Sequence, residues 1–279
     1  MESKNANNIE YLGYFVWWSL NDVKVRQEDL QTLLQDSGVD YEVPEISKRS
    51  AFLKAVRTIS AQYKNKGLLI RKIKKGSTSY VFGLVDENVS EQFESLYYSH
   101  SATMRFFPES GQLTCDRSHR AFDLIQNLYS EYREVLNSDD VRSIILNLLG
   151  KVYSVSVRQR GGIYFIPAKH TSFVEKMEKI FNKLPGDCHL AVAPQIDAEK
   201  SKKAIHRALM DSLKTQMEGF EKDLEDGGLQ RTHALTARLE EFKDLKDKVS
   251  YYADAMQFQA DSVKAKLDAL SQKVRAKLV

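Results

Sequence analysis

The sequence has few cysteines, few prolines and no long hydrophobic run. Of its 279 residues, 2 are Cys and 5 are Pro. Cys115 and Cys188 stand far apart, with no second cysteine near either, which excludes a disulfide framework and a CxxC zinc or redox site. The apolar run within residues 11–20 is too short to cross a bilayer and has no signal-peptidase pattern after it. We therefore expect a cytoplasmic protein that makes no contact with a membrane.

The motifs of common catalytic and nucleotide-binding sites are absent as well. The sequence contains no P-loop, no dinucleotide-binding glycine pattern and no nucleophile elbow. Cys115, Asp116 and His119 place a thiol, a carboxylate and an imidazole within five residues, which could activate a nucleophile or bind a metal. A turn in which an Asp or Ser caps the following helix explains them more simply. We predict a protein that is not an enzyme, with no catalytic residues, metal or cofactor; an enzyme with an unrecognised site is an alternative.

What the sequence does contain is an ordinary apolar content with an uneven charge distribution. Hydrophobic residues make up 42% and charged residues 28%, which is typical of a folded globular chain. The net charge is only +3, but residues 1–46 hold 3 basic and 9 acidic residues, and residues 47–75 hold 10 basic and none that is acidic. The rest of the chain is close to neutral. The charge imbalance is therefore confined to the first quarter of the sequence.

Periodicity predicts a mixed α+β region followed by a long helical tail. A helix over about 47–67 precedes two strand-like runs, 68–73 and 79–85, which is the order of a winged helix. The order recurs with a helix over 141–149 and strands 152–157 and 163–166, joined by a basic turn. We predict an N-terminal α+β unit over 1–110, a second one over 111–196, and a helical hairpin or coiled coil over 197–279.

The tail carries an apolar repeat of alternate steps of four and three residues. Eleven of the twelve positions from Leu235 to Val274 are apolar, which favours a coiled-coil seam on one helix of nearly fifty residues, roughly 70 Å long. Its hairpin partner, 198–224, is shorter, so part of the seam needs another surface. We therefore predict a homo-oligomer; the alternative is that the seam packs on its own chain. The predicted oligomerisation residues are Leu235, Leu239, Phe242, Val249, Met256, Val263, Leu267, Leu270 and Val274.

The cationic stretch is the main candidate for function. Lys and Arg side chains neutralise phosphates, so a basic helix and hairpin without acidic residues is typical of a nucleic-acid-binding surface. The alternative is a solvated face that neutralises the acidic first segment, within one chain or between subunits. The predicted nucleic-acid-binding residues are Lys48, Arg49, Lys54, Arg57, Lys64, Lys66, Arg71, Lys72, Lys74, Lys75, Arg158 and Arg160.

Two stretches resemble the recurring signatures of a family. These are VPEISKRSAFLKAVRTI, which begins at Val43, and VRQRGGIYFIP over Val157 to Pro167. They are similar to signatures of an uncharacterised family of unknown function found in phages, bacteria and archaea, over roughly residues 12–196. The resemblance implies a phage, mobile-element or defence setting, and it implies no catalytic residue.

Two functions from different classes follow from these features. The first is an oligomeric protein that binds DNA or RNA through its basic helix and hairpin. The second is a scaffold subunit that assembles with itself or with other proteins of the same genetic module, through its coiled coil and complementary charges. Nucleic-acid binding that weakens steeply with salt distinguishes the first from the second.

Overall fold

The structure is a computed structural model that describes residues 11–76, 78–90, 95–158, 161–225 and 232–277. It is a mixed α+β fold, as predicted, and its described residues divide into two compact units. Unit 1 comprises the described residues within 1–21, 37–39 and 142–279, and unit 2 comprises those within 22–36 and 40–141. The predicted boundaries at 110 and 196 differ from this division. The reason is that Tyr11 to Asn21 pair with Ile196 to Asp187, so the beginning of the chain belongs with its second half.

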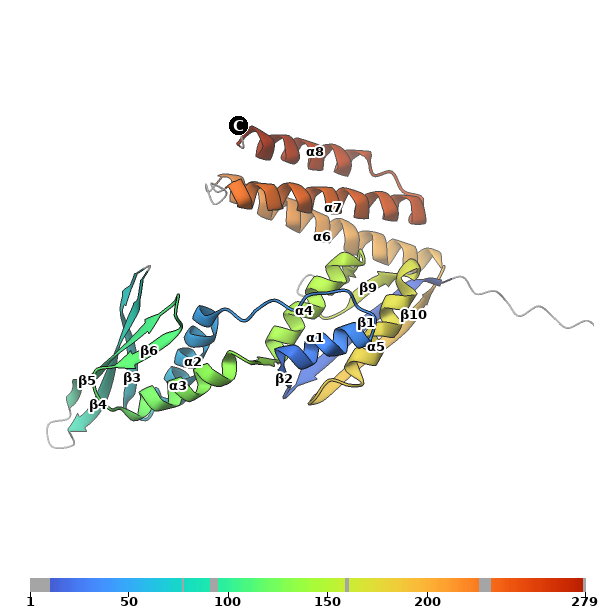
Figure 1. Ribbon diagram of the computed structural model, residues 1–279. Coiled ribbons are helices and arrows are strands. Elements are labelled where there is room, and N and C mark those ends of the chain that lie inside the picture. Colours follow the sequence, from blue (N-terminus) through green and yellow to red (C-terminus); the bar gives the residue numbers. More distant parts are fainter. Residues whose placement is uncertain (1–10, 77, 91–94, 159–160, 226–231, 278–279) are drawn as a thin grey trace, which may run out of the picture. The chain divides into compact units, whose positions relative to one another are not determined.

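Unit 1 is built on a four-stranded sheet in the order β10-β1-β9-β8. The described neighbours in this sheet pair in antiparallel register. Its elements are β1 (Tyr11–Asn21), β8 (Val155–Ser156), β9 (Tyr164–Pro167), the 3-10 turn η1 (Ala168–His170), α5 (Thr171–Phe181), β10 (Asp187–Ile196), α6 (Glu199–Glu225), α7 (Thr232–Met256) and α8 (Asp261–Ala276). The α6–α7–α8 bundle covers one face of the sheet through Phe15 and Phe165, and α5 packs against β9 and β10 (Figure 1).

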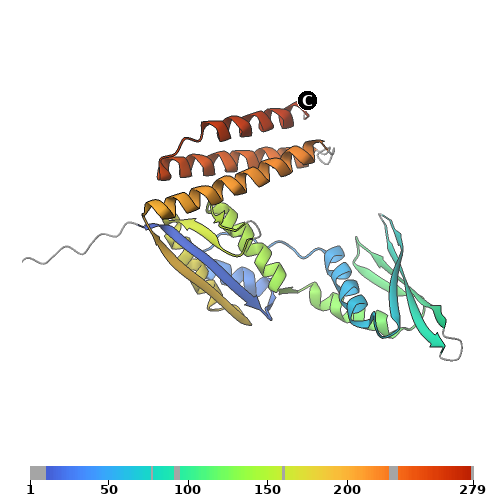
Figure 2. The same cartoon turned by 180° about the vertical axis from the view of Figure 1, so that it is seen from behind.

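Unit 2 contains a separate four-stranded antiparallel sheet, in the order β3-β4-β5-β6, and a short strand pair, β2 with β7. Its elements are β2 (Lys24–Arg26), α1 (Gln27–Asp36), α2 (Lys48–Tyr63), β3 (Leu68–Lys75), β4 (Tyr80–Ser90), β5 (Ser95–Phe107), β6 (Gln112–Cys115), α3 (Arg120–Tyr132) and β7 (Val135–Asn137). The helix α4 (Ser138–Lys151) begins in unit 2 and ends in unit 1. Both α2 and α3 lie on the same side of the β3–β6 sheet, as Figures 1 and 2 show.

Most predicted elements are present, but their assembly differs from two winged-helix-like units. The predicted helix and hairpin of residues 47–85 are α2, β3 and β4, and the hairpin continues into β5 and β6 to form a four-stranded meander. The second predicted hairpin is β8 with β9, which joins β1 and β10 in the other sheet. Local periodicity identifies strands, whereas the partners of a strand depend on the whole chain.

The prediction of a single long tail helix from the heptad repeat is wrong, because the tail forms two helices, α7 and α8. The helix α7 ends at Met256, and Gln257 has a φ of 55°, in the left-handed region. The N–H of Phe258 donates to the carbonyl of Ala253 at 3.2 Å, the 6→1 hydrogen bond of a Schellman motif. The chain then reverses into α8, which packs along α7 and α6 (Figure 2). A non-glycine residue occupies the position where glycine is usual, so the sequence shows no stop signal there.

The predicted oligomerisation residues therefore lie within the bundle of their own chain. Leu235, Phe242, Val249, Val263, Leu267, Leu270 and Val274 are buried, and Leu239 and Met256 are partly buried against the same core. Polar contacts fix α8 in place: Lys246 pairs with Asp268 at 2.6 Å, and Lys277 donates to the Leu224 carbonyl at 2.6 Å. The apolar stripe packs on its own chain, and the number of subunits stays a prediction.

The bundle is also anchored to the segment that leads into β8. The ammonium of Lys248 donates to the carbonyl of Ser154, and the hydroxyl of Tyr252 donates to the carbonyl of Tyr153 at 2.8 Å. Burial lowers the pKa of Lys248 to about 8. Both side chains come from α7, so this helix is held to the sheet by polar contacts as well as by its apolar face.

Candidate nucleic-acid interface

The helix α2 positions the first part of the predicted basic stretch. Its N-terminus is capped by Ser47, whose side chain accepts a hydrogen bond from the Ser50 N–H at 3.4 Å. Phe52, Ala55 and Ile59 recur at three- and four-residue spacing and are buried against the β3–β6 sheet. Charged residues between these positions consequently lie on the flanks or on the outer side of α2.

Two of the predicted basic residues of α2 have structural partners. The ammonium of Lys54 is 2.8 Å from Asp140 Oδ2, and that of Lys48 donates to the Glu109 carbonyl at 3.0 Å. Both side chains are half-buried. These two lysines are thus engaged within the fold of unit 2, whereas Arg57 and Lys64 are exposed.

The second part of the basic stretch lies on β3, and strand register places its residues on two different faces. Ile70 pairs with the buried Leu84 and Lys72 with the buried Phe82, on the side that faces α2. A β-bulge between Lys72 and Lys74 shifts the register, so that Lys74 pairs with Val81. Side chains that lie directly opposite each other point to the same face of a sheet. The bulge therefore sends Lys74 to the face opposite Lys72.

Arg49, Lys72 and Lys75 lie on the helix-bearing side of the sheet. Lys75 pairs with Tyr80, and the guanidinium of Arg49 lies 5.4 Å from the centre of the Tyr80 ring. The three side chains are exposed. They form a small basic cluster at the edge where α2 begins.

Among the described residues of unit 2, no helix packs on the opposite side of the sheet, and this side has a basic character of its own. We call it the helix-free face and define it by Arg71, Ile73 and Lys74 of β3, Val81, Gly83, Val85 and Glu87 of β4, Tyr98, His100, Thr103 and Arg105 of β5, and Thr114 of β6. A Cβ built on Gly83 would lie 3.2 Å from the Ile73 side chain and 3.4 Å from the His100 ring, which places both side chains over Gly83.

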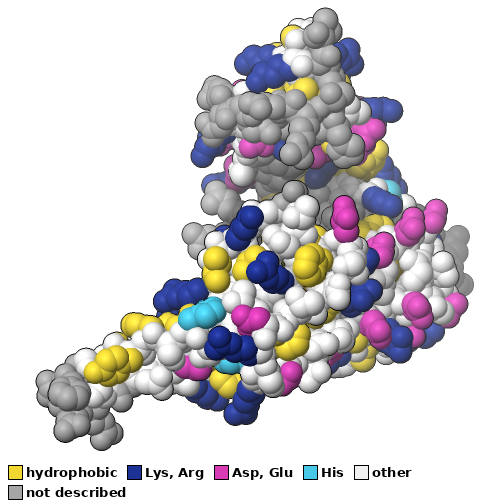
Figure 3. Space-filling model, turned by 60° about the vertical axis from the view of Figure 1, so that its left-hand side comes forward, with side chains coloured by type: hydrophobic (Ala, Val, Ile, Leu, Met, Phe, Trp, Pro, Cys, Tyr) yellow, Lys and Arg dark blue, Asp and Glu magenta, His cyan; other side chains and the backbone are white. Residues whose placement is uncertain are grey.

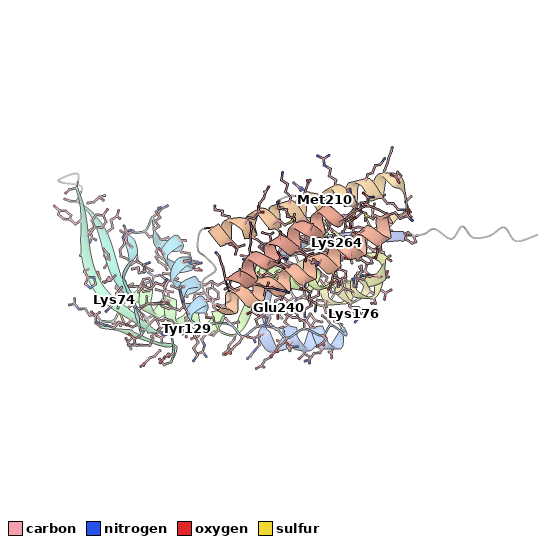
Figure 4. All side chains as sticks on the ribbon, turned by 90° about the horizontal axis from the view of Figure 1, so that it is seen from above. Lys74, Tyr129, Lys176, Met210, Glu240 and Lys264 are labelled. Carbon is pink, nitrogen blue, oxygen red and sulfur yellow. The ribbon has the colours of Figure 1, made fainter. Side chains whose placement is uncertain are left out.

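Cations flank the centre of the helix-free face. Lys74 and Arg105 are each paired with Val81, one from either side, and Arg71 and Thr103 are each paired with Gly83. Val81 is only 7% exposed although no helix covers it, which is expected when long basic side chains lie over an apolar neighbour. Figure 3 shows Lys and Arg, hydrophobic and histidine side chains beside one another on this unit, with Asp or Glu side chains among them, and Figure 4 labels Lys74 on β3.

Arg105 is a candidate residue that sequence reasoning missed. It lies thirty residues beyond Lys75, outside the acid-free stretch, and joins Arg71 and Lys74 only through the pairing of β4 with β5. A weak signal exists in the sequence, because Arg105 stands between two apolar residues, Met104 and Phe106. The structure buries both of them fully. Such alternation indicates an outward-facing arginine on a half-buried strand.

Neutralisation of the basic stretch by the acidic first segment within one chain has no ion pair behind it in the described residues, and neutralisation between subunits stays a prediction. Within that part of the chain, the basic residues of 47–75 form one ion pair, Lys54 with Asp140, and none with an acid of residues 11–46. The ion pairs that the first segment does form are made by its cations, Lys24 with Glu131 and Arg26 with Glu134. The exposed cations of β3 are therefore available to an external anion.

The other predicted basic residues, Lys66, Arg158 and Arg160, do not belong to the helix-free face. The side chain of Lys66 lies 5.2 Å from the centre of the Tyr63 ring, at the end of α2. Arg158 is exposed and belongs to unit 1, not to unit 2. Arg160 lies outside the described residues.

The Cys115–His119 segment forms a structural turn. The Asp116 carboxylate accepts a hydrogen bond from the Thr103 N–H at 2.7 Å, and this bond holds the pKa of Asp116 below its ordinary value. The cap of α3 is His119, whose Nδ1 accepts from the Ala121 N–H at 3.1 Å. An Asp or Ser was expected to cap this helix, and a histidine does so. Among the described residues, no three His, Cys, Asp or Glu side chains come together as a metal site would require.

The fold and the basic face define an α+β protein with a helix-free, cationic sheet surface. The chain belongs to a family of unknown function, DUF6744, whose model matches residues 11–279. No curated protein and no solved structure matches the chain. Of the helices in the described ranges, none is long and apolar enough to span a bilayer.

Proposed function

We propose that this protein binds nucleic acid through the cations of its helix-free face and the adjoining edge of β3. The proposal rests on one observation: Arg71 and Lys74 of β3 lie on the same sheet face as Arg105 of β5, a strand about thirty residues further along the chain. Clustered Lys and Arg side chains attract phosphates and release their counterions, independently of nucleotide sequence.

A competing explanation applies to part of this surface. Edge strands are commonly protected from pairing with other chains by lysines and β-bulges, and β3 is an edge strand that has both. This explanation does not extend to Arg105, because β5 is an inner strand with β4 on one side and β6 on the other. The inner arginine therefore favours a ligand over edge protection alone.

The test is a salt titration of binding by fluorescence anisotropy, with unlabelled sequence-unrelated DNA and RNA as competitors. We expect wild-type protein to bind at low salt and to lose affinity steeply as salt rises. Simultaneous replacement of Arg71, Lys74 and Arg105 by Glu should weaken binding roughly tenfold or more and lower the slope of log K against log salt by about 2 to 3. The folding control is the circular dichroism spectrum, which should not change because the side chains are on the surface.

A charge-matched control variant separates this surface from net charge. Lys200, Arg207 and Lys222 are exposed on α6 of unit 1, and their replacement by Glu changes the net charge by the same amount. We expect this variant to bind almost as wild type does. Equal losses in the two variants would show that no particular face is used, and absence of binding by wild type at low salt would refute the proposal and favour a scaffold.

A further inference from the structure

The helix-free face carries rings and apolar side chains among its cations. Ile73 is 61% exposed and Tyr98 is 59% exposed, and the exposed His100 ring lies over Gly83. Tyr98 pairs with Glu87 and His100 with Val85, which places both on the same face as Val81 and Gly83 by alternation along β4. Exposed rings add no affinity for phosphates. The bases of a single strand, however, stack on aromatic side chains.

The charge of the β4–β5 ribbon argues against a duplex ligand. A two-stranded ribbon can enter the major groove, and β4 and β5 extend past the beginning of β3 as such a pair. The described acids of this ribbon are Asp86 and Glu87, however, and no Lys or Arg occurs between residues 76 and 104. This ribbon would be repelled by the phosphates that line a groove.

The arrangement instead fits a strand that runs along β5. A β-bulge between His100 and Ala102 places Tyr98 and Arg105, which are seven residues apart, on the same face. The partner strand covers this path with six residues, from Glu87 to Val81, which is roughly 20 Å. Along this path, Lys74 and Arg105 lie at the level of Val81 and Arg71 at the level of Gly83. His100 follows at the level of Val85, and Tyr98 lies at the other end. A path of this length matches the sites of ~4 nucleotides or more that single-strand-binding sheets cover.

We propose, on the basis of the function proposed above, that the ligand is single-stranded nucleic acid, with its phosphates at Arg71, Lys74 and Arg105 and a base stacked on Tyr98. The tyrosine acts through its ring face. Glu87 lies opposite Tyr98, so the proposal places a base, and not one of the cation-bound phosphates, at this end of the path.

The test compares fluorescent oligo-dT of about 15 nucleotides with a duplex of equal length, both at low salt, on full-length protein. We expect tighter binding of the single strand. Tyr98→Ala should weaken single-strand binding roughly five- to 100-fold, and Tyr98→Phe should keep most of the affinity because the ring is retained. Duplex binding through cations alone should be nearly the same in wild type and in Tyr98→Ala.

The neighbouring tyrosine provides a matched control. Tyr97 is 53% exposed and pairs with Asn88, on the other side of the sheet. Tyr97→Ala should bind the single strand as wild type does. Three results would each overturn the single-strand assignment while leaving nucleic-acid binding intact. These are equal losses of affinity in Tyr97→Ala and Tyr98→Ala, an equal loss of affinity in Tyr98→Phe and Tyr98→Ala, and tighter binding of the duplex than of the single strand. If neither ligand binds, the proposed function itself fails.

Discussion

At the residue scale, Gly13 is the position in unit 1 where a side chain is least tolerated. It lies in β1, opposite Pro167 of β9, with a φ of 154°. A Cβ at this position would lie 2.1 Å from the Ile166 carbonyl oxygen, an overlap with backbone that no rotamer change relieves. The close approach of β1 to β9 thus depends on the missing side chain.

We predict that Gly13→Ala lowers the free energy of unfolding by roughly 3 kcal/mol or more. Gly219 is the matched control, because it is exposed in α6 and a Cβ there would meet nothing within 4 Å. Gly219→Ala should raise stability by up to ~1 kcal/mol through helix propensity. Urea denaturation measures the free energy of unfolding of both variants. A Gly13→Ala protein as stable as wild type would contradict the described pairing of β1 with β9.

At the element scale, the end of α7 decides how the apolar tail is used. The Schellman motif at Gln257 turns the chain, so α8 supplies to its own bundle the apolar residues that a continuous helix would offer to another subunit. Leu267 is fully buried there, whereas Gln272 on the same helix is exposed. The two residues make a direct comparison of the buried and the outer side of α8.

Leu267→Ala should destabilise the protein by roughly 2–5 kcal/mol, the cost of a cavity in a packed core, and Gln272→Ala should change stability by less than about 0.5 kcal/mol. Denaturation should be accompanied by sedimentation measurements, in which we expect the same mass for both variants as for wild type. A Leu267→Ala protein that unfolds normally but has fewer subunits would show that the seam serves assembly after all.

At the scale of the whole molecule, each compact unit has its own hydrophobic core. Ile205 belongs to the core of unit 1 and Ile59 to that of unit 2, and both are almost fully buried. Chains with two cores often unfold in more than one step. The same substitution in each core therefore reports on each unit separately.

We predict that Ile59→Val and Ile205→Val each cost about 0.5–1.5 kcal/mol and lower different calorimetric transitions by roughly 2–4 °C. The heat-capacity trace of wild type should resolve two components. A single transition that both variants lower equally would mean that the units unfold as one cooperative body.

The sequence by itself determined most of the local structure. The apolar spacing of Phe52, Ala55 and Ile59 specified α2, and the runs on either side of Gly76 specified β3 and β4, because periodicity is written in neighbouring residues. The absence of acids between residues 47 and 75 likewise identified a basic element. Short strands such as β2, β6 and β7 were missed, since three or four residues carry little periodicity.

Only the tertiary structure decided which distant residues share a surface. The bulge after Lys72 splits one basic run between two faces, and pairing with β4 brings Arg105 beside Lys74. The pairing of β1 with β10 joins the two ends of the sheet-forming chain, and the turn at Gln257 returns α8 to its own bundle. Strand register and chain reversal depend on long-range packing, so no local pattern in the sequence specifies them. A shift of the register by one residue would exchange the two faces of a strand.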